Sequence, residues 1–331
     1  MNREELKKLQ EMAIEQQRKL IRFKDERIRV LLEVYAEFLQ DIEKELSYLY
    51  TKTSLGSPED AWDWDEIRRG KDLEAILKQM EMSIDRMNGE VTGIITNSIK
   101  TVGVVDYAFA SYIAAAHIQG YIIVPPVIPE RAIKILVEKD WGHGHFSDNL
   151  WGQTENFKED LRKTLVNSMK RGESFRTTTI ALQERIGQEA YKSERLVRSE
   201  IITASNEAKK EYMTDFDKRS NEMGMDLLKA MKVLETLDNR TCKKCQAMDG
   251  REFSVEEAKS IPATEHPNCR RTFVAVIRGF NNANRQRAAR SMNTGKTYRT
   301  DAKNFEEYAK EQGLDSASDY SKQYKKQESE E

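Results

Sequence analysis

The chain has 331 residues, of which 33% are charged and 38% hydrophobic, and its formal net charge is −2 at pH 7. This composition is typical of long, solvated helices, and the length allows two domains with an ample core. Three cysteines exclude a disulfide scaffold, and the charged start Met1–Lys8 excludes a secretory signal peptide, so we expect the protein to be kept inside a cell or inside something assembled there.

The N-terminal region is predicted to consist of long helices. Apolar residues recur at three- and four-residue steps from Glu4 to Tyr50, which predicts one or two helices with a thin apolar face. Such a helix usually packs on a helix of its own chain or on another subunit. Ser57 and Pro58 favour the start of another helix, and a further helical run is predicted from Leu73 to Ile99.

The stretch from Tyr107 to Val124 carries no formal charge and reaches the lower length limit for a membrane span. Its alanines and the polar residues His117 and Gln119 favour a buried helix instead, so we expect no membrane partner. Three prolines end this run. The glycine-flanked His143 and His145 then predict a plain loop, with a metal site as the alternative.

A second helical region begins near Trp151 and ends at Arg171-Gly172. One or two shorter helices are predicted for Ser174 to Ser193, and a longer one for Glu194 to Phe216. Two charged residues in the middle of that longer helix, Arg198 and Glu200, are catalytic candidates, but such pairs are mostly solvated or bonded to neighbours.

The periodicity changes after Gly224. Met231 to Leu237 is predicted as a strand, Asp249-Gly250 as a hairpin-type turn, and Arg251 to Phe253 as a short returning strand. The final strand is predicted at Thr272 to Ile277. The predicted fold class is therefore α+β and predominantly α-helical, with a small β subdomain at residues 231–277.

All three cysteines lie in this subdomain at metal-ligand spacing. The pattern is C-x2-C, twenty residues, then H-x2-C, and it comprises Cys242, Cys245, His266 and Cys269. Two such pairs close a tetrahedral sphere, and thiolate and imidazole ligands suit zinc. We therefore predict a structural Zn²⁺ that provides much of the stability of the subdomain. The alternative is that the cysteines are buried apolar residues and the histidine lies at the surface.

Three sequence blocks resemble the MuF-like head morphogenesis family, the minor head proteins of tailed bacteriophages. They are L-V-R-S-E-I-I-T-A-S-N-E-A from Leu196, D-N-R-T-C-K-K-C-Q-A-M-D-G from Asp238, and H-P-N-C-R-R from His266, in the order of the family. The resemblance covers roughly Trp151 to Ile277. The chain departs from the family's frequent pattern by lacking a tryptophan near Val233 and by having C-R-R where C-R-C is frequent.

The resemblance implies a minor phage head protein that is associated with the portal protein and acts in head morphogenesis. It also implies contact with scaffolding or capsid protein, and it allows ejection with the packaged DNA. The expected location is the interior of the virion head, with the host cytoplasm during assembly. We divide the chain into a long-helix docking region at 1–145, a MuF-like domain at 146–280, and a basic segment with a disordered polar tail at 281–331.

The region from residue 270 to residue 300 contains no Asp or Glu, and its arginines are candidates for phosphate contacts with double-stranded DNA without sequence preference. The alternative is a solvated basic segment balanced by acidic helices. The candidate nucleic-acid residues are Arg270, Arg271, Arg278, Arg285, Arg287 and Arg290, with Lys296 and Arg299 beyond them.

Three classes of function follow, and the assembly protein without enzymatic activity is the one we predict. A zinc-dependent nuclease-like enzyme is the first alternative, but four good ligands leave no open coordination position. A deaminase would require H-x-E and P-C-x-x-C, which the chain lacks. The second alternative is a DNA-binding module that uses the metal subdomain and its basic extension.

Overall fold

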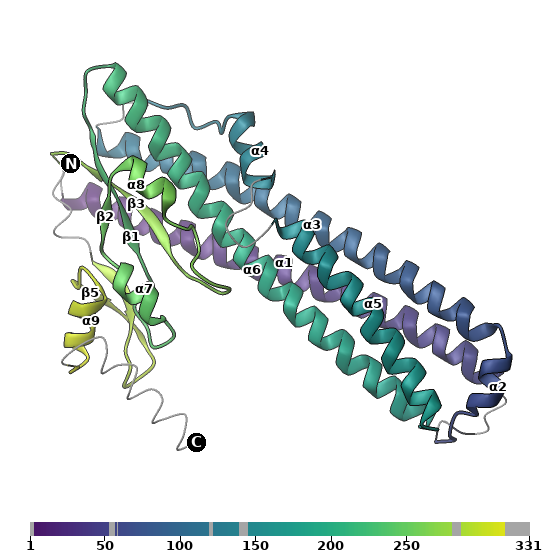
Figure 1. Cartoon of the computed structure of the whole chain (residues 1–331). Coiled ribbons are helices and arrows are strands. Elements are labelled where there is room, and N and C mark those ends of the chain that lie inside the picture. Colours follow the sequence, from purple (N-terminus) through teal and green to yellow (C-terminus); the bar gives the residue numbers. More distant parts are fainter. Residues whose placement is uncertain are drawn as a thin grey trace. The chain divides into compact units, whose positions relative to one another are not determined.

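A computed structural model describes residues 3–52, 57, 59–118, 122–138, 145–279 and 286–314 (Figure 1). It is mostly helical with small antiparallel sheets, in agreement with the predicted α+β class. The chain divides into two compact units. The helical unit comprises Ile21–Ser98 and Gly142–Glu200, and the sheet unit comprises Met1–Leu20, Ile99–Trp141 and Ile201–Glu331. The functional division at residues 145 and 280 stays a prediction.

Three long helices contribute segments to both units: α1 (Arg3–Lys52), α3 (Asp72–His117) and α6 (Phe175–Glu222). The helical runs predicted separately at Leu73–Ile99 and Tyr107–Val124 are therefore continuous in α3, which ends at His117, and those predicted at Ser174–Ser193 and Glu194–Phe216 are one helix, α6. Between the first two runs, Gly103 allows close packing, because a Cβ there would lie 2.5 Å from Leu136 Cδ1.

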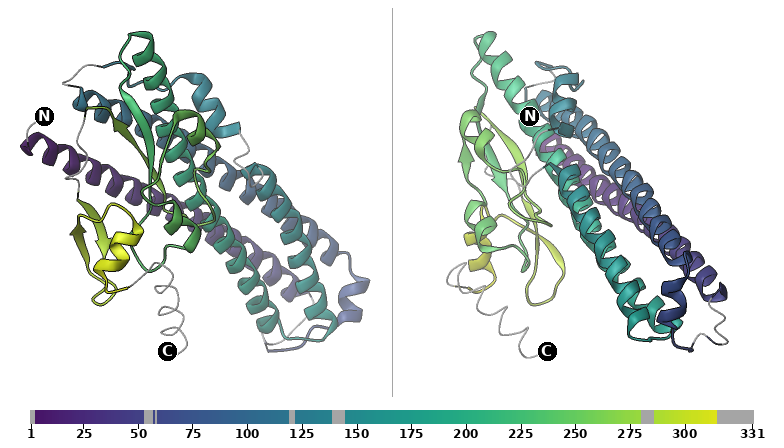
Figure 2. Two further views of the ribbon diagram at one scale, coloured as in Figure 1. Left: turned by 60° about the vertical axis from the view of Figure 1, so that its left-hand side comes forward. Right: turned by 45° about the vertical axis from the view of Figure 1, so that its right-hand side comes forward.

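The helical unit is built from α1, α2 (Trp64–Arg69), α3, α5 (Phe146–Lys170) and α6. The long segments lie side by side in each view (Figures 1 and 2). Apolar side chains at three- and four-residue steps fill the space between them. The buried residues of α1 within this unit are Ile28, Leu31, Tyr35, Phe38, Ile42, Leu46 and Leu49.

Two buried hydrogen bonds fix the register of elements in the helical unit. Tyr35 Oη lies 2.8 Å from Ser193 Oγ, and Trp62 Nε1 donates to Thr178 Oγ1 at 3.0 Å. Buried Tyr and Trp side chains need such partners, because an unpaired polar atom in the core costs free energy. The bond to Ser193 lies where the sequence suggested a helix break.

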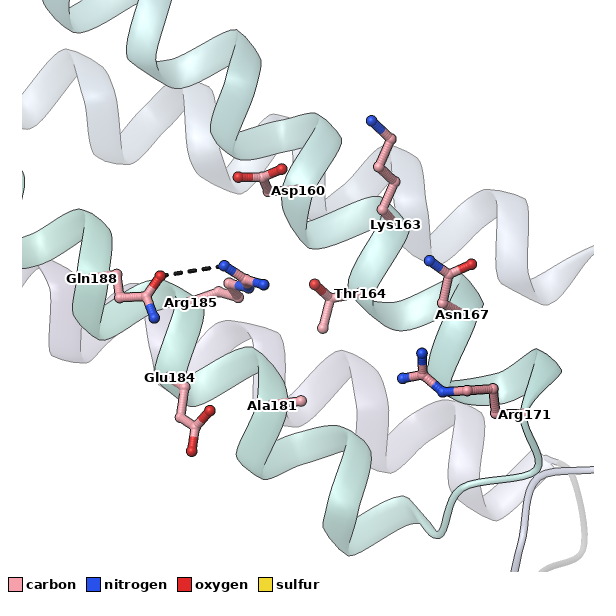
Figure 3. Close-up of a pocket in the computed structure, with 9 residues that line it drawn as sticks. All are labelled: Asp160, Lys163, Thr164, Asn167, Arg171, Ala181, Glu184, Arg185 and Gln188. Atoms are coloured by element: carbon pink, nitrogen blue, oxygen red, sulfur yellow. Dashed lines mark hydrogen bonds between the residues drawn. The ribbon is translucent and has the colours of Figure 1, made fainter.

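A polar groove of about 400 Å³ lies between α5 and α6 of the helical unit (Figure 3). Its charged residues include both signs, and Arg185 Nη1 donates to Gln188 Oε1 at 3.3 Å across one turn of α6. This mixture of mostly exposed side chains of both charges presents no convergent set for a defined ligand. The lining residues are Asp160, Lys163, Thr164, Asn167, Arg171, Ala181, Glu184, Arg185 and Gln188.

The main sheet of the sheet unit has the order β2-β1-β3 and is antiparallel. Strand β1 (Leu228–Leu234) lies in the centre, and β2 (Glu252–Phe253) and β3 (Thr272–Ile277) flank it. The strand predicted at Thr272–Ile277 is confirmed, and those predicted at Met231–Leu237 and Arg251–Phe253 overlap β1 and β2. Asp249-Gly250 is a turn, but it does not join β1 directly to β2 as a hairpin. Helix α7 (Lys243–Met248) lies between β1 and β2, and α8 (Val255–Ser260) follows β2.

The chain beyond β3 is folded where it is described. Strands β4 (Arg287–Arg290) and β5 (Thr297–Thr300) form a hairpin, and α9 (Phe305–Glu311) packs beside it. β3 is therefore not the final strand. The predicted disordered tail beyond Leu314 lies outside the described residues. The buried cluster of this segment comprises Leu237, Ala289, Ala302, Phe305, Tyr308, Ala309 and Leu314.

The uncharged stretch of α3 contributes to the core of the sheet unit. Tyr107, Ser111 and Ala114 are buried, and Ser111 Oγ donates to the carbonyl of Val124 at 2.8 Å. The segment continues through 122–129 to α4 (Glu130–Glu138). In the part of the chain that the structure describes, no helix is both long enough and apolar enough to cross a membrane.

We expect Glu200 to make the helical unit less stable as the pH rises. Burial raises the pKa of Glu200 to about 7 from 4.5, against the opposing charge of His145. Between these values the folded state binds more protons than the unfolded state, so this residue's contribution to stability falls with increasing pH. Replacing it by Gln should therefore raise the free energy of unfolding by about 1–3 kcal/mol above pH 7.5 and change it little below pH 4.

Urea denaturation of wild type and E200Q at several pH values measures this difference. E184Q, which removes an exposed carboxylate from the same helix, controls for the loss of one charge. A stability difference between E200Q and wild type that does not grow from pH 4 to pH 8 contradicts the prediction.

Candidate metal centre

The structure brings the predicted metal ligands together from two segments. Cys242 is the N-cap of α7 and Cys245 lies in its first turn, whereas His266 and Cys269 lie in the loop before β3. Nε2 of His266 lies 3.2 Å from Cys242 Sγ and 3.5 Å from Cys245 Sγ. The sulfurs of Cys245 and Cys269 are 3.8 Å apart.

These distances fit the edges of a tetrahedral zinc site. Zn–S bonds of about 2.3 Å and Zn–N bonds of about 2.0 Å place sulfurs about 3.8 Å apart and sulfur about 3.5 Å from nitrogen. The ligand atoms of Cys242, Cys245 and His266 lie within 4.8 Å of one another. Cys269 joins this group through Cys245. The donor set is therefore suited to a metal ion of the zinc type.

The first ligand pair is supported by the block that precedes it. The Asp238 carboxylate accepts from the backbone N–H of Arg240 at 3.0 Å and from Arg270 Nη2 at 2.8 Å. Burial opposes ionisation of Asp238, but the Arg270 guanidinium outweighs it and holds the pKa below its ordinary value. Gln246 Nε2 then donates to the carbonyl of Thr241 at 2.7 Å, which ties α7 to this turn.

The second ligand pair depends on an unusual backbone conformation. Asn268 has a φ of 63°, in the left-handed region that asparagine tolerates better than most residues. This turn lets the N–H of Cys269 donate to the carbonyl of His266 at 3.0 Å. Nδ1 of His266 lies 2.8 Å from the carbonyl of Pro267, so a proton on Nδ1 leaves Nε2 as the ligand atom facing the sulfurs.

Helix α6 holds the ligand loop, which we define as residues 261–272. Asn206 Nδ2 donates to the carbonyls of Ala263 and Arg271, both at 2.9 Å. Thr203 Oγ1 lies 2.9 Å from Thr264 Oγ1, and Asn206 is 1% exposed. The buried polar residues of the first sequence block thus position the loop that carries His266 and Cys269.

Two lysines of α6 add further bonds to the same loop. Lys210 Nζ donates to the carbonyl of Ile261 at 2.9 Å, and Lys209 Nζ donates to Thr272 Oγ1 at 3.2 Å. Sequence reasoning missed these positioning residues and Asn206. Their signal was a set of polar residues on the face of α6 that also carries the buried Ile201, Ala204 and Ala208.

The catalytic candidates of α6 are not part of this site. Arg198 pairs with Glu194 one turn earlier in the helix, and both Arg198 and Glu200 belong to the helical unit. His145 is the N-cap of α5 and accepts from the backbone N–H of Ser147 at 3.3 Å. His143 lies outside the described residues.

Most of the arginines predicted to contact phosphates bond within the fold. Arg271 Nε donates to Glu235 Oε1 at 2.7 Å, and the Arg271 side chain is 0% exposed. The Arg287 guanidinium donates two hydrogen bonds, of 2.8 and 2.9 Å, to the Asp249 carboxylate. The phosphate prediction is therefore wrong for Arg271, because no nucleic acid can reach its guanidinium. Arg287 and the Asp238-bound Arg270 are likewise committed to internal carboxylates.

The remaining predicted nucleic-acid residues differ in their surroundings. Arg278 pairs with Asp226 at 3.0 Å, and Arg290 Nε donates to the carbonyl of Gly295 at 2.8 Å. Arg285 lies outside the described residues. Arg290 and Arg299 point away from the buried cluster, because Ala289 and Thr300 occupy the inward positions of the same hairpin.

The two buried thiols of the site, Cys245 and Cys269, lie within hydrogen-bond distance of each other. A hydrogen bond from the Cys245 thiol lowers the pKa of Cys269, although burial opposes this shift, and Arg271 favours the thiolate. The same hydrogen bond and burial raise the pKa of Cys245. The lowered pKa favours the thiolate of Cys269, which is the form that binds a metal.

Replacing Asn206 by Ala should destabilise the sheet unit by about 2–4 kcal/mol, because two buried carbonyls of the ligand loop lose their donor. Asn167 on α5 is exposed, so N167A is the matched control. Urea denaturation measures both variants. A loss below about 1 kcal/mol for N206A contradicts the role assigned to this amide.

Comparison with known proteins is informative for one region of the chain. The family model described as Phage Mu protein F like protein matches residues 159–274. Neither the curated proteins nor the solved structures include a significant match. The matched region contains the three sequence blocks, the α6 contacts and all four metal ligands. The predicted family is confirmed: residues 159–274 belong to the Phage Mu protein F-like family of phage head morphogenesis proteins.

Proposed function

We propose that this protein is a minor, portal-associated component of the phage head that acts in head morphogenesis without enzymatic activity. The observation that carries the proposal is the family match over residues 159–274. The contacts of α6 with the ligand loop support a rigid structural part. Buried amide and ammonium groups of Asn206 and Lys210 donate to three backbone carbonyls of the loop, and Thr203 and Thr264 add a hydrogen bond between their hydroxyls. Its location would be the interior of the virion head.

The metal centre supports a structural role in this proposal. Three sulfurs and one imidazole would fill a tetrahedral Zn²⁺ and leave no position for an activated water. The ion would link α7 to the ligand loop. It would therefore stabilise a loop that is already hydrogen-bonded to α6. A nuclease-like enzyme would need an open position and a further acid or base directed at it.

The N-terminal helices are the proposed docking region for the portal protein. α1 exposes large apolar side chains within the helical unit: Ile21 is 51% exposed, Leu32 44% and Tyr48 49%. Isolated exposed apolar residues are ordinary on a protein surface. These three recur along one long helix with a thin apolar face, however, and apolar anchors are what an assembly contact uses.

Contact with packaged double-stranded DNA is a lesser part of the proposal. Of the basic residues between 270 and 300, Arg290, Lys296 and Arg299 are exposed on the β4–β5 hairpin. These three cations of the described hairpin neutralise at most about three phosphates, which gives weak binding that salt readily reverses. The assembly function is therefore favoured over a DNA-binding module.

The first test is capture of the portal protein. Co-expression of the full chain with the portal protein of the same phage should give a complex that co-purifies. Replacing Ile21 and Leu32 together by Asp should reduce the recovered portal protein about tenfold, because buried apolar anchors dominate such contacts. E33Q, at an exposed position of the same helix, should retain the portal protein.

Two outcomes of this capture experiment count against the proposal. Full recovery with a folded I21D/L32D variant contradicts docking through α1. Failure of the wild-type chain to retain any portal protein contradicts the portal association itself.

The second test is metal content. Purified without chelators, the wild-type chain should contain about one zinc ion, and C269S should lose most of it because one thiolate ligand is removed. H145Q removes a histidine outside the cluster and should keep the zinc. Inductively coupled plasma mass spectrometry gives the stoichiometry. A metal-free wild-type protein that binds no added zinc contradicts the structural metal.

A further inference from the structure

A buried carboxylate lies beside the two thiols of the proposed metal centre. Glu235 directly follows β1, and its side chain is 2% exposed. One of its oxygens and the sulfurs of Cys245 and Cys269 all lie within 4.8 Å of one another. Carboxylate oxygens are ordinary zinc ligands. Glu235 is thus a fifth potential ligand, which no cysteine–histidine spacing indicated.

The side chain of Arg271, a residue of the ligand loop, bridges this carboxylate and the start of the same loop. Its Nε donates to Glu235 Oε1 at 2.7 Å, and its Nη1 donates to the carbonyl of Pro262 at 2.9 Å. A carboxylate oxygen of Glu265 lies 3.7 Å from Arg271 Nη1. The third nitrogen, Nη2, is buried and has no hydrogen-bond partner among the described residues. A buried N–H group that bonds nothing is costly, so a role for its charge is expected.

The charges of the site explain why the carboxylate needs a partner. Zn²⁺ with three thiolates and a neutral imidazole carries a formal charge of 2 − 3 = −1. An unpaired Glu235 beside it would bring the charge of a buried region to −2. The Arg271 guanidinium neutralises Glu235, whose carboxylate oxygen itself lies within 4.8 Å of the Cys245 and Cys269 sulfurs.

We propose that Arg271 is a positioning residue that holds Glu235 outside the coordination sphere of the metal. The ligands of the ion are then Cys242, Cys245, His266 and Cys269. The Glu235–Arg271 ion pair lies beside the two buried sulfurs without binding the ion. The backbone supports the same arrangement, because the carbonyl of Arg271 accepts from Asn206 and fixes where the side chain starts. This inference rests on the structural metal proposed above.

The test replaces Arg271 by Met in the full chain and examines the metal directly. Zinc-loaded wild type should show three sulfurs and one nitrogen by X-ray absorption. R271M leaves Glu235 free to bind, so its spectrum should gain one oxygen, and the cobalt(II) form should lose visible absorption as its coordination number rises. The double variant R271M/E235Q lacks the carboxylate and should return to the wild-type spectra.

A second variant keeps the inference testable if R271M does not fold. In E235Q the amide oxygen still accepts from Arg271 Nε, so the fold should persist, as circular dichroism will show. The cobalt spectrum of E235Q should equal that of wild type if Glu235 is not a ligand. A changed spectrum makes Glu235 a native ligand and overturns the proposal.

The failures of the two proposals are distinguishable. A wild-type chain that binds no zinc and no cobalt(II) defeats both the structural metal and this inference. A wild type with three sulfurs and one nitrogen, together with a folded R271M that has the same spectra, defeats only the role of Arg271. R271K provides the conservative rescue and should keep Glu235 away from the ion.

Discussion

The two hydrogen bonds of the Asn206 amide are the contact on which the candidate site depends. They join α6 to the first and last parts of the ligand loop, at Ala263 and Arg271, and each is 2.9 Å long. The loop contains the left-handed turn at Asn268, which a free peptide would rarely adopt. With the loop ends fixed, His266 and Cys269 face α7 without further adjustment. The ligand set therefore depends on the packing of a helix as much as on the spacing of its cysteines.

Charge inside the sheet unit is arranged as matched pairs, and this arrangement decides what the arginines can do. Arg270, Arg271 and Arg287 each bind a largely buried acid: Asp238, Glu235 and Asp249 respectively. Removing one partner of such a pair lowers the free energy of unfolding far more than a surface salt bridge raises it. A run of basic residues without acids in the sequence is therefore no measure of a basic surface, because the acids that neutralise it lie earlier in the chain.

Much of the candidate site could be predicted from the sequence, and the exceptions have physical reasons. Spacing identified Cys242, Cys245, His266 and Cys269, because ligand pairs must come from tight turns. It could not identify Glu235 or Asn206, since their positions depend on how β1 and α6 pack. The expected hairpin at Gly250 is not formed, because α7 lies between the two strands. Gly250, with a φ of 82°, instead forms the turn that follows this helix. Its missing side chain admits the α9 segment, where a Cβ would lie 2.8 Å from Asn304 Cβ.

The strands after β3 were not predicted from the sequence either, and their presence changes the expected contribution of the metal to stability. The sequence of β4, R-A-A-R, has no β-branched or aromatic residue, so propensity does not indicate a strand. Its Ala289 nevertheless packs with Phe305 and Tyr308 in a buried cluster that also contains Leu237 of the segment leading to Cys242. The first ligand segment thus rests on an apolar core, and the second is held by α6. Zinc would then join two parts that are already ordered, so its contribution to folding should be smaller than in a zinc finger, where ligation supplies nearly all of the stability.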